Sequence, residues 1–404
     1  MKRIIFINRF FFPDQSATSQ ILSDLLFAIQ GQVNAEFHVI TSRNTYENNM
    51  YLKSFEEMNG IKIHRVWTTR FGRSNLLGRA FDYLSFYVST LLSLLFLLRK
   101  GDIAVAKTDP PVISFIAYMV VRLKRAYLIN WIQDLFPEVA GELGVLRKNS
   151  TLFHVLKTIK NISIKSASMN VVIGEKMARI LADDGVVDEK ISVIHNWNIN
   201  TATEYVPRER NELITKWGLK DKFVIGYSGN FGRAHEYDSI IKMIEAFKEQ
   251  GDISFLFIGG GKYYNDLKKY VDVKDINNIK FMSYQHKDNL NHSLSVPHVH
   301  LISLKPELEG LIVPSKFYGL ASIGAPMIFI GSKDGQIGSM LQENHCGVVV
   351  SNTNPEALVE SIENIRSGVL DISEMSSRVK ALYNSRYRPE IAYQKWCNIL
   401  ERYV

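Results

Sequence analysis

The sequence predicts an α/β fold built from two consecutive doubly wound units. Short apolar runs alternate with longer stretches in which apolar residues recur at helical spacing. Most of the short runs lack the alternation of apolar and polar residues that a half-exposed strand shows, so they are typical of parallel strands covered by helices on both faces. With 404 residues, 46% of them hydrophobic, the chain is long and apolar enough to bury two cores.

The predicted strands form two series, one for each Rossmann-like unit. The first comprises residues 2–8, 36–41, 61–67, 102–106, 127–132, 170–173 and 191–194, and the second residues 223–227, 253–258, 279–282, 299–303, 327–330 and 347–350. We place the first domain at residues 1–195 and the second at 196–388. Residues 389–404 read as a helix with one apolar face, which we expect to pack back on the first domain.

Composition narrows the class of partner. The net charge of +7 and the isoelectric point near 9.1 fit anionic partners such as nucleic acid, phospholipid or phosphorylated small molecules. Cys346 and Cys397 lie far apart, without a CxxC pattern, which argues against a disulfide framework and a structural zinc. The start of the chain is similar to a signal peptide, but Asn8 and Arg9 interrupt the apolar run, so we interpret it as a first buried strand.

The run from Glu309 to Gly319 is the stretch of the sequence that is most informative about a ligand site. It places a carboxylate, a short turn and then Pro314-Ser315-Lys316 at the start of a predicted helix. Backbone amides at a helix N-terminus favour anions, and a lysine in the first turn adds a full positive charge. Such a run is suited to holding a sugar at one end and its diphosphate at the other, which suggests an enzyme that handles an activated sugar.

Together with other segments, this run makes the chain resemble GT-B fold glycosyltransferases of family 4. The resemblance is to the branch of bacterial transferases for fucose-type and N-acetylfucosamine-type sugars of O-antigen and colanic acid, and it covers essentially the whole length. The segments are Phe12-Pro13 with residues 16–19, Asp109-Pro110-Pro111, and residues 131–138, 226–233, 257–261 and 309–319.

The resemblance implies retaining sugar transfer from a UDP or GDP sugar, without metal or other cofactor. It implies a cleft between the domains, with the acceptor, a polyprenyl-diphosphate-linked glycan, on the first domain at the cytoplasmic face of the inner membrane. The expected products are bacterial surface polysaccharides: O-antigen, capsule or exopolysaccharide. No Asp-x-Asp stands at a strand end, where a metal-dependent transferase would hold magnesium.

The resemblance also suggests site residues. Asp134 and Glu309 are the candidates for catalysis, Asp134 as an acceptor-site residue with a base role. The acceptor candidates are Asp14, Ser16, Thr18, Asp134 and Glu138. The donor candidates are Gly229, Asn230, Arg233, Gly260, Gly261, Tyr284, Glu309, Gly310, Leu311, Ser315 and Lys316.

The chain departs from the family pattern at two places. Asn230 stands where the family usually has an arginine, and the position of its lysine falls at about His235, so we assign the missing charge to Arg233. Gly319 occupies the position of a second glutamate that binds the ribose hydroxyls. Recognition of the ribose therefore stays open.

Each candidate also has a structural alternative. Glu309 can be a solvated loop acid, in which case Glu307 beside it can be the relevant carboxylate, and Lys316 and Arg233 can be exposed charges. Gly259, Gly260 and Gly261 can simply form a turn between a strand and a helix. Asp134 can cap the following helix, and Ser16 and Thr18 can be helix N-cap residues.

Two stretches bear on membrane contact. Residues 81–98 are apolar, with Asp82 as the only charge and with Arg79, Arg99 and Lys100 on the flanks, and they reach the lower limit for spanning. A spanning helix would separate residues 102–106 from their sheet, so we expect a buried or interfacial helix. Residues 147–176 are basic, and we expect Lys157, Lys160 and Lys165 to share one face of a helix. This face either attracts anionic lipid or is an ordinary solvated surface.

Two other functions compete with sugar transfer to a lipid-linked acceptor. A nucleotide-sugar epimerase or hydrolase of the same fold has no need of a lipid-facing first domain. A nucleic-acid-binding protein should interleave basic and aromatic residues, whereas the aromatic residues here lie mostly within apolar runs. We therefore expect no nucleic-acid partner.

Overall fold

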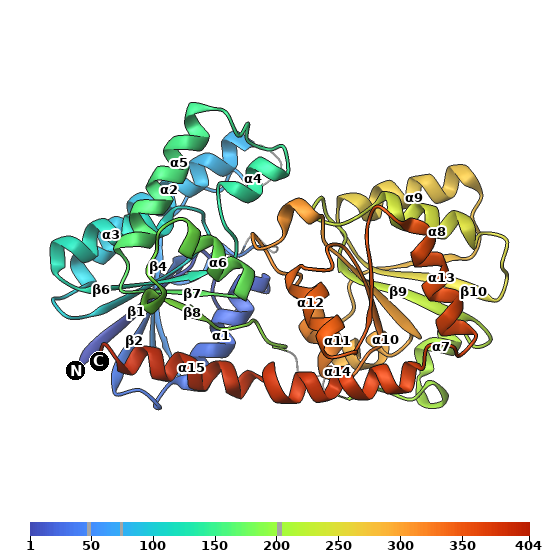
Figure 1. The fold of residues 1–404 in the computed structure, drawn as a ribbon. Coiled ribbons are helices and arrows are strands. Elements are labelled where there is room, and N and C mark those ends of the chain that lie inside the picture. Colours follow the sequence, from blue (N-terminus) through green and yellow to red (C-terminus); the bar gives the residue numbers. More distant parts are fainter. Residues whose placement is uncertain (47–49, 73–75, 200–203) are drawn as a thin grey trace. The chain divides into compact units, whose positions relative to one another are not determined.

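The computed structural model describes residues 1–46, 50–72, 76–199 and 204–404 (Figure 1). The chain divides into two compact units, Met1–His195 with Glu390–Val404, and Asn196–Pro389. Each unit is a largely or wholly parallel sheet with helices on both faces. The predicted α/β fold of two Rossmann-like units is confirmed.

The first unit contains an eight-stranded sheet. Its strands are β1 (Lys2–Ile7), β2 (Ala35–Ser42), β3 (Phe55–Met58), β4 (Ile61–Val66), β5 (Ile103–Lys107), β6 (Tyr127–Ile132), β7 (Met169–Val172) and β8 (Ile191–Val193). Its helices are α1 (Ala17–Ile29), α2 (Leu76–Leu97), α3 (Ile113–Lys124), α4 (Glu138–Glu142), α5 (Thr151–Ser166), α6 (Glu175–Asp183) and α15 (Pro389–Glu401).

The strand order of this sheet is β3-β4-β2-β1-β5-β6-β7-β8, with β3 antiparallel to β4 and the other pairs parallel. The chain winds outward in one direction from β1 and in the other from β5, so the switch point lies between these two strands. The sequence did not predict β3, because its two glutamates mask the strand pattern at the sheet edge.

Alternating side chains of β1 bind the two helical layers to this sheet. Ile5 and Ile7 pack into an apolar cluster with residues of α2 and α3. Phe6 points to the other face, where its ring lies 6.4 Å from that of Trp396 on α15. Trp396 also packs at 4.8 Å from Trp131 of β6, so the C-terminal helix completes the core of the first unit.

The second unit contains a six-stranded sheet. Its strands are β9 (Phe223–Asn230), β10 (Ile253–Gly260), β11 (Ile279–Met282), β12 (Val299–Ser303), β13 (Met327–Ile330) and β14 (Val348–Val350). Its helices are α7 (Glu212–Lys216), α8 (Asp238–Ala246), α9 (Lys262–Lys274), α10 (Leu290–Leu294), α11 (Lys316–Ile323), α12 (Gln336–Glu343), α13 (Pro355–Arg366) and α14 (Ile372–Arg386).

All strands of this sheet are parallel, in the order β11-β10-β9-β12-β13-β14. Ile225 and Tyr227 of β9 face a cluster that includes residues of α8, α9 and α13, whereas Val224 faces the opposite cluster with Leu219. The chain returns from β11 to place β12 beside β9. In such sheets ligands bind beyond the carboxyl ends of the strands at this switch point.

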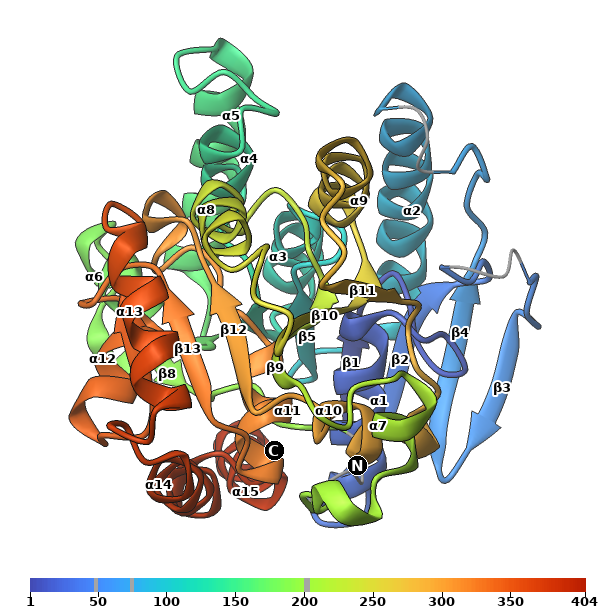
Figure 2. The same ribbon diagram turned by 90° about the vertical axis from the view of Figure 1, so that its right-hand side faces the viewer.

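Helix α2 packs against α3, β2 and β4 (Figure 2). Its Phe86 and Leu94, and Leu98 directly after it, lie in the core of the first unit. By length and composition alone, Leu77–Leu97 could cross a membrane, and 22% of its most apolar part is buried. One such helix is weak evidence for a membrane span, because core helices of soluble proteins can have the same length and composition. One side of α2 is buried against the fold, and an interfacial position stays a prediction.

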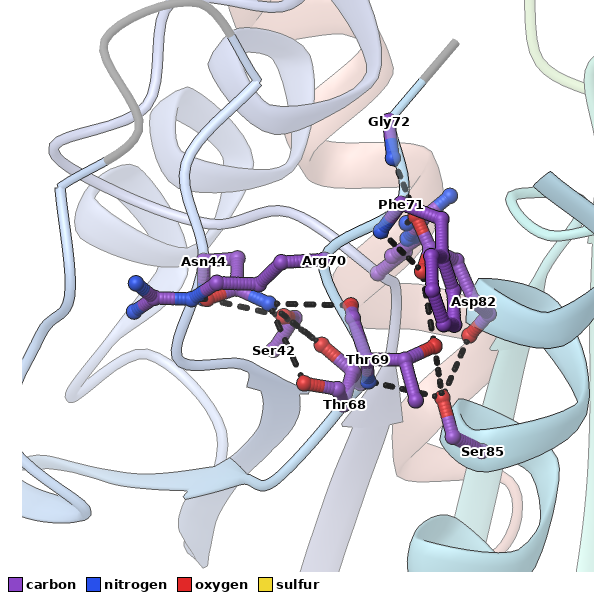
Figure 3. A network of polar contacts seen from close by, with 10 residues as sticks. Ser42, Asn44, Thr68, Thr69, Arg70, Phe71, Gly72, Asp82 and Ser85 are labelled. Carbon is purple, nitrogen blue, oxygen red and sulfur yellow. Dashed lines mark hydrogen bonds and ion pairs between the residues drawn. The ribbon is translucent and has the colours of Figure 1, made fainter. Parts of the chain in front are cut away.

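Asp82, the one acid of this apolar helix, is buried and fully engaged (Figure 3). It accepts hydrogen bonds from the Thr69 hydroxyl at 2.7 Å and from the backbone amides of Phe71 and Gly72 at 3.0 and 3.1 Å. Its carboxylate also lies 3.3 Å from Nη2 of the buried Arg9. Asp82 thus fixes α2 to the segment before it and to the end of β1.

The prediction that Lys160 belongs to an exposed basic face of α5 is wrong. This side chain is buried, and its Nζ lies 2.6 Å from Glu138 and 3.3 Å from Asp184. Burial of a lysine requires such partners, because an unpaired charge in the interior is costly. Lys160 therefore holds α4 and α6 to α5 and is not available to lipid.

Replacing Asp82 by alanine should destabilise the first unit by about 3–5 kcal/mol, because it leaves Arg9 buried without its counter-ion. The measurement is hydrogen exchange of the β1 and β5 amides, which reports on the first unit separately. Exposed Asp183→Ala on α6 is the matched control. Equal protection in the two variants would show that Asp82 does not anchor the helix.

Candidate functional site

Glycine residues bring the ends of β9 and β10 into close contact. Gly259 and Gly261 have φ angles of 131° and 118°. A Cβ on Gly259 would lie 2.3 Å from the carbonyl oxygen of Gly229, and one on Gly261 would lie 2.4 Å from Oδ1 of Asn230. Only glycine fits at such distances and such φ angles. These residues form a backbone-lined floor at the carboxyl end of the second sheet.

Lys316, the first residue of α11, reaches this floor. Its Nζ lies 3.5 Å from the centre of the Tyr227 ring, and its Cε lies 3.9 Å from the position of a Cβ on Gly229. The residue as a whole is half-buried, but Nζ is enclosed and has no hydrogen-bond partner among the described residues. Burial lowers the pKa of this amine well below 10.5. Burial disfavours the charged form of this amine, so an anion bound beside it would restore the proton and gain a charge-assisted hydrogen bond.

Two histidines, the buried His300 and the half-buried His235, lie close enough to Lys316 to interact with its charge. Nδ1 of His235 lies 2.6 Å from the carbonyl oxygen of Ser303, and Nε2 of His300 lies 2.8 Å from that of Leu294. Burial, and to a lesser extent the charge of Lys316, lowers the pKa of His235 to about 3. Burial likewise lowers the pKa of His300 to about 4. Both imidazoles are therefore neutral at pH 7, so neither of them brings a positive charge next to Lys316.

Glu309 lies at the N-terminus of another helix. Its Oε2 accepts a hydrogen bond from the backbone amide of Gln336, the first residue of α12, at 3.0 Å. A Cβ on Gly335 would lie 2.2 Å from Oε1 of Glu309, so a side chain there would displace the carboxylate. The run from Glu309 to Lys316 thus connects an acid at one helix N-terminus with a lysine at the start of another.

The other donor candidates lie on the same loops. The Tyr284 ring, 63% exposed, lies 3.3 Å from the position of a Cβ on Gly260. Arg233 is exposed in the loop after β9. Gly319 lies within α11, where a Cβ would meet nothing within 4 Å. Gly310 forms the turn after Glu309 with a φ of 77°, Leu311 is buried, and Ser315 is an exposed N-cap residue without a side-chain cap.

In the first unit, the acceptor candidates Asp14, Ser16 and Thr18 lie beyond β1, next to the switch point of that sheet. Buried Asp14 accepts hydrogen bonds from the amides of Ser16 and Tyr46, so it shapes its own loop. The Thr18 hydroxyl donates to Oδ2 of Asp109 at 3.1 Å. Ser16 Oγ is enclosed and makes no cap bond to α1. The loops after β1 and β5 are thereby joined.

Asp134 lies beyond β6 beside the same loops. It does not cap the following helix, because the N-cap of α4 is Pro137 and receives no side-chain bond. The residue is exposed at its surface, although many protein atoms surround the carboxyl and partly desolvate it. This desolvation and the nearby charge of Asp109 raise its pKa to about 6, against the opposing charge of Lys107. A carboxyl with such a pKa is suited to take up a proton near neutral pH.

Glu138, the fifth acceptor candidate, is engaged within the fold. It starts α4, and its Oε1 lies 2.6 Å from Nζ of Lys160. The contact ties α4 to α5, so the structure gives Glu138 a packing role.

Two residues of these regions escaped the sequence analysis. Tyr227 reads as an ordinary apolar strand residue, and only the fold shows its ring beneath Lys316. Lys107 ends β5, fully buried, with Nζ donating to the carbonyl oxygen of Thr18 at 2.7 Å. Burial lowers its pKa to about 7. The sequence feature that could have indicated Lys107 is a lysine at the end of an otherwise apolar strand.

Among the described residues, no group of three or more His, Cys, Asp or Glu side chains is placed to hold a metal ion. The fold is similar to solved glycosyltransferase structures. Sucrose-phosphate synthase from Thermosynechococcus elongatus matches with a TM-score of 0.77 at 12% identity, covering 100% of this chain and 99% of that one. Anabaena HepE in complex with UDP and glucose matches with 0.72 at 14% identity and 99% coverage of both chains. WaaG, a glycosyltransferase involved in lipopolysaccharide biosynthesis, matches with 0.69 at 12% identity, covering 98% and 99%.

These similarities define the class of the fold as GT-B, as the sequence predicted. Residues 209–374, within the second unit, match the family described as glycosyl transferases group 1. The probable glycosyltransferase WbjE of Pseudomonas aeruginosa is 26% identical over 301 residues, 74% of either chain.

The neutral histidines make the second unit sensitive to acid. Because the pKa of His300 is about 4 when folded and about 6.5 when unfolded, protons favour the unfolded state, and stability falls as pH drops from 6.5 towards 4. His300 alone should cost about 2 kcal/mol at about pH 5, since one pKa unit equals about 1.4 kcal/mol. Urea unfolding at several pH values measures this slope. His300→Gln should flatten it, and exposed His286→Gln should not.

Proposed function

We propose that this protein is a retaining glycosyltransferase of the family 4 type, which moves a hexose-type sugar from a UDP or GDP sugar to a lipid-linked oligosaccharide. The second unit binds the donor and the first binds the acceptor. The observation that carries the proposal is the enclosed amine of Lys316, above a glycine floor at the switch point of the region that matches the family.

A nucleoside diphosphate leaving group fits this arrangement. When the bond between the sugar C1 and the diphosphate breaks, negative charge grows on the phosphate oxygens. Lys316 supplies a positive charge, and the first turn of α11 supplies backbone amides. The UDP complexes of HepE, a structural neighbour, support a nucleotide at such a site. We assign Arg233 to the outer phosphate and propose that no metal or other cofactor takes part, because these groups provide the neutralising charge.

The acceptor hydroxyl is assigned to the loops beyond β1, β5 and β6. Its oxygen forms the new bond to C1, and its proton passes to Asp134 or to the departing diphosphate. The raised pKa of Asp134 and its freedom from any cap of α4 support the first route.

The biological setting is proposed from relatives. WaaG is described as involved in lipopolysaccharide biosynthesis, and WbjE as a probable glycosyltransferase. We propose synthesis of a bacterial surface polysaccharide, such as O-antigen, capsule or exopolysaccharide, at the cytoplasmic face of the inner membrane.

Lys316→Ala should weaken nucleotide diphosphate binding about ten- to hundredfold, because it removes one charge-assisted bond of about 1.5–3 kcal/mol. Arg233→Ala should have a smaller effect, because its side chain is exposed. Calorimetry with UDP and GDP measures both. Exposed Lys268→Ala on α9 is the control for loss of a positive charge.

Thermal shift with UDP, GDP, dTDP and CMP should show one preferred nucleotide, because a ligand that binds only the folded state raises its stability. Binding of none of them, or unchanged binding by Lys316→Ala, would refute the donor site. Conversion of the nucleotide sugar without any acceptor would instead indicate an epimerase or hydrolase.

Asp134→Asn should lower turnover about 10²- to 10⁴-fold while nucleotide affinity stays unchanged, because a general base acts on the reaction and not on donor binding. The wild-type rate should rise as pH increases through about 6, where Asp134 loses its proton. The variant should lack this rise. An unchanged pH profile would assign proton transfer to the diphosphate.

A further inference from the structure

Helix α2 presents an apolar face to solvent. Six residues form what we call the α2 stripe, and their exposed fractions run from 51% to 85%: Leu77, Phe81, Leu84, Val88, Leu92 and Phe96. They follow one another at intervals of three or four residues, so they lie along one side of the helix. Phe86 and Leu94 face the opposite way, into the core. At about 1.5 Å per residue the stripe is about 28 Å long.

Aromatic residues extend the stripe at its N-terminal end. Phe71, 62% exposed, lies with its ring 5.9 Å from that of Phe81. Trp67 is 57% exposed, and its carbonyl oxygen accepts a hydrogen bond from Ser89 of α2 at 2.8 Å. Aromatic side chains of this kind are enriched at the boundary between lipid and water.

The charges around the stripe have one sign. Between residues 77 and 108 of the described chain, the only acids are Asp82 and Asp102, and both are buried. Arg99, Lys100, Arg122 and Arg125 are exposed. The amide of Gly101 donates to the carbonyl oxygen of Arg125 at 3.1 Å, so the ends of α2 and α3 lie together. An apolar stripe that ends in a cluster of arginine and lysine complements an anionic lipid surface.

We infer that the α2 stripe is the surface by which this protein docks on an anionic phospholipid bilayer. The stripe enters the boundary between headgroups and acyl chains, and the cluster formed by Arg99, Lys100, Arg122 and Arg125 contacts lipid phosphates. The helix does not span the bilayer, because its other side is packed on α3 and the sheet. This inference rests on the proposed function in one respect: the lipid-linked acceptor is the reason for docking.

The anchor at Asp82 connects this surface to the acceptor loops. Asp82 pairs with Arg9 directly beyond β1, and the amide of Arg9 donates to the carbonyl oxygen of Asp109 at 2.8 Å. The loops that carry Asp14, Ser16 and Thr18 are therefore held at a fixed position relative to α2. Docking through the stripe would set the height of these loops above the lipid.

The test is sedimentation of the full chain with vesicles of phosphatidylcholine, with and without phosphatidylglycerol. Binding should require phosphatidylglycerol and weaken at high salt, because the Debye length is only about 10 Å at 0.1 M. Leu84→Glu with Leu92→Glu should reduce partition at least about tenfold, since each buried leucine contributes about 1.5–3 kcal/mol. The control is Val273→Glu with Val369→Glu, which changes two exposed valines of the second unit and should bind like wild type.

A second variant tests the charges without touching the stripe. Arg99→Gln with Lys100→Gln and Arg125→Gln should lower binding to phosphatidylglycerol vesicles and remove most of the salt dependence. Thermal melting of each variant checks the fold.

Three outcomes would overturn the inference. One is equal binding by the stripe variant and its control. Another is a dimer, seen by light scattering, that the stripe variant dissociates without any vesicle binding, which would make the stripe an interface between copies. A third is a protein in cell membranes that resists alkaline carbonate, which would indicate spanning. Nucleotide-induced thermal shift, measured in parallel, reports on the second unit, so its failure counts against the proposed function alone.

Discussion

The parallel winding of each sheet from its centre is the constraint on which the rest of the structure depends. In the second unit, β9 has β10 on one side and β12 on the other, although β10 and β11 separate β9 from β12 in the chain. The loops that follow these strands must therefore end at one edge. Gly229, Gly259 and Lys316 come together at this edge because of the strand order. The strand order therefore fixes where the site lies, and the side chains decide what it can bind.

The two units handle buried charge in opposite ways. In the first unit, Asp82 lies against Arg9, and Lys160 against Glu138 and Asp184, so burial of charge joins elements together. In the second unit, Lys316 is enclosed against the Tyr227 ring with neutral histidines nearby. An enclosed amine without an acid beside it becomes favourably charged when an anionic ligand binds next to it. This contrast separates structural ion pairs from the candidate site more clearly than residue type does.

Sequence patterns predicted most of the fold because parallel strands are apolar along their whole length. Residues 127–132, 279–282, 299–303 and 327–330 were predicted with the bounds that the structure has. The edge strand β3 was missed, since two of its four residues are glutamate. Lys160 was assigned to a lipid-facing surface, because helical spacing shows which residues share a side and not which side packs on another element.

The same division holds for the candidate site. Local order in the chain placed Glu309 and Lys316 at either end of one run, and glycine spacing marked the turns after β9 and β10. Tertiary structure alone decided that the Tyr227 ring lies beneath Lys316, that Lys107 reaches Thr18, and that desolvation together with Asp109 raises the pKa of Asp134. The sequence by itself determined the strands, the turns and the residue types available. The tertiary structure determined the distances between side chains that are remote in the chain and the extent to which each is buried. These two quantities set the pKa values, because charge interactions depend on separation in space and on the exclusion of water.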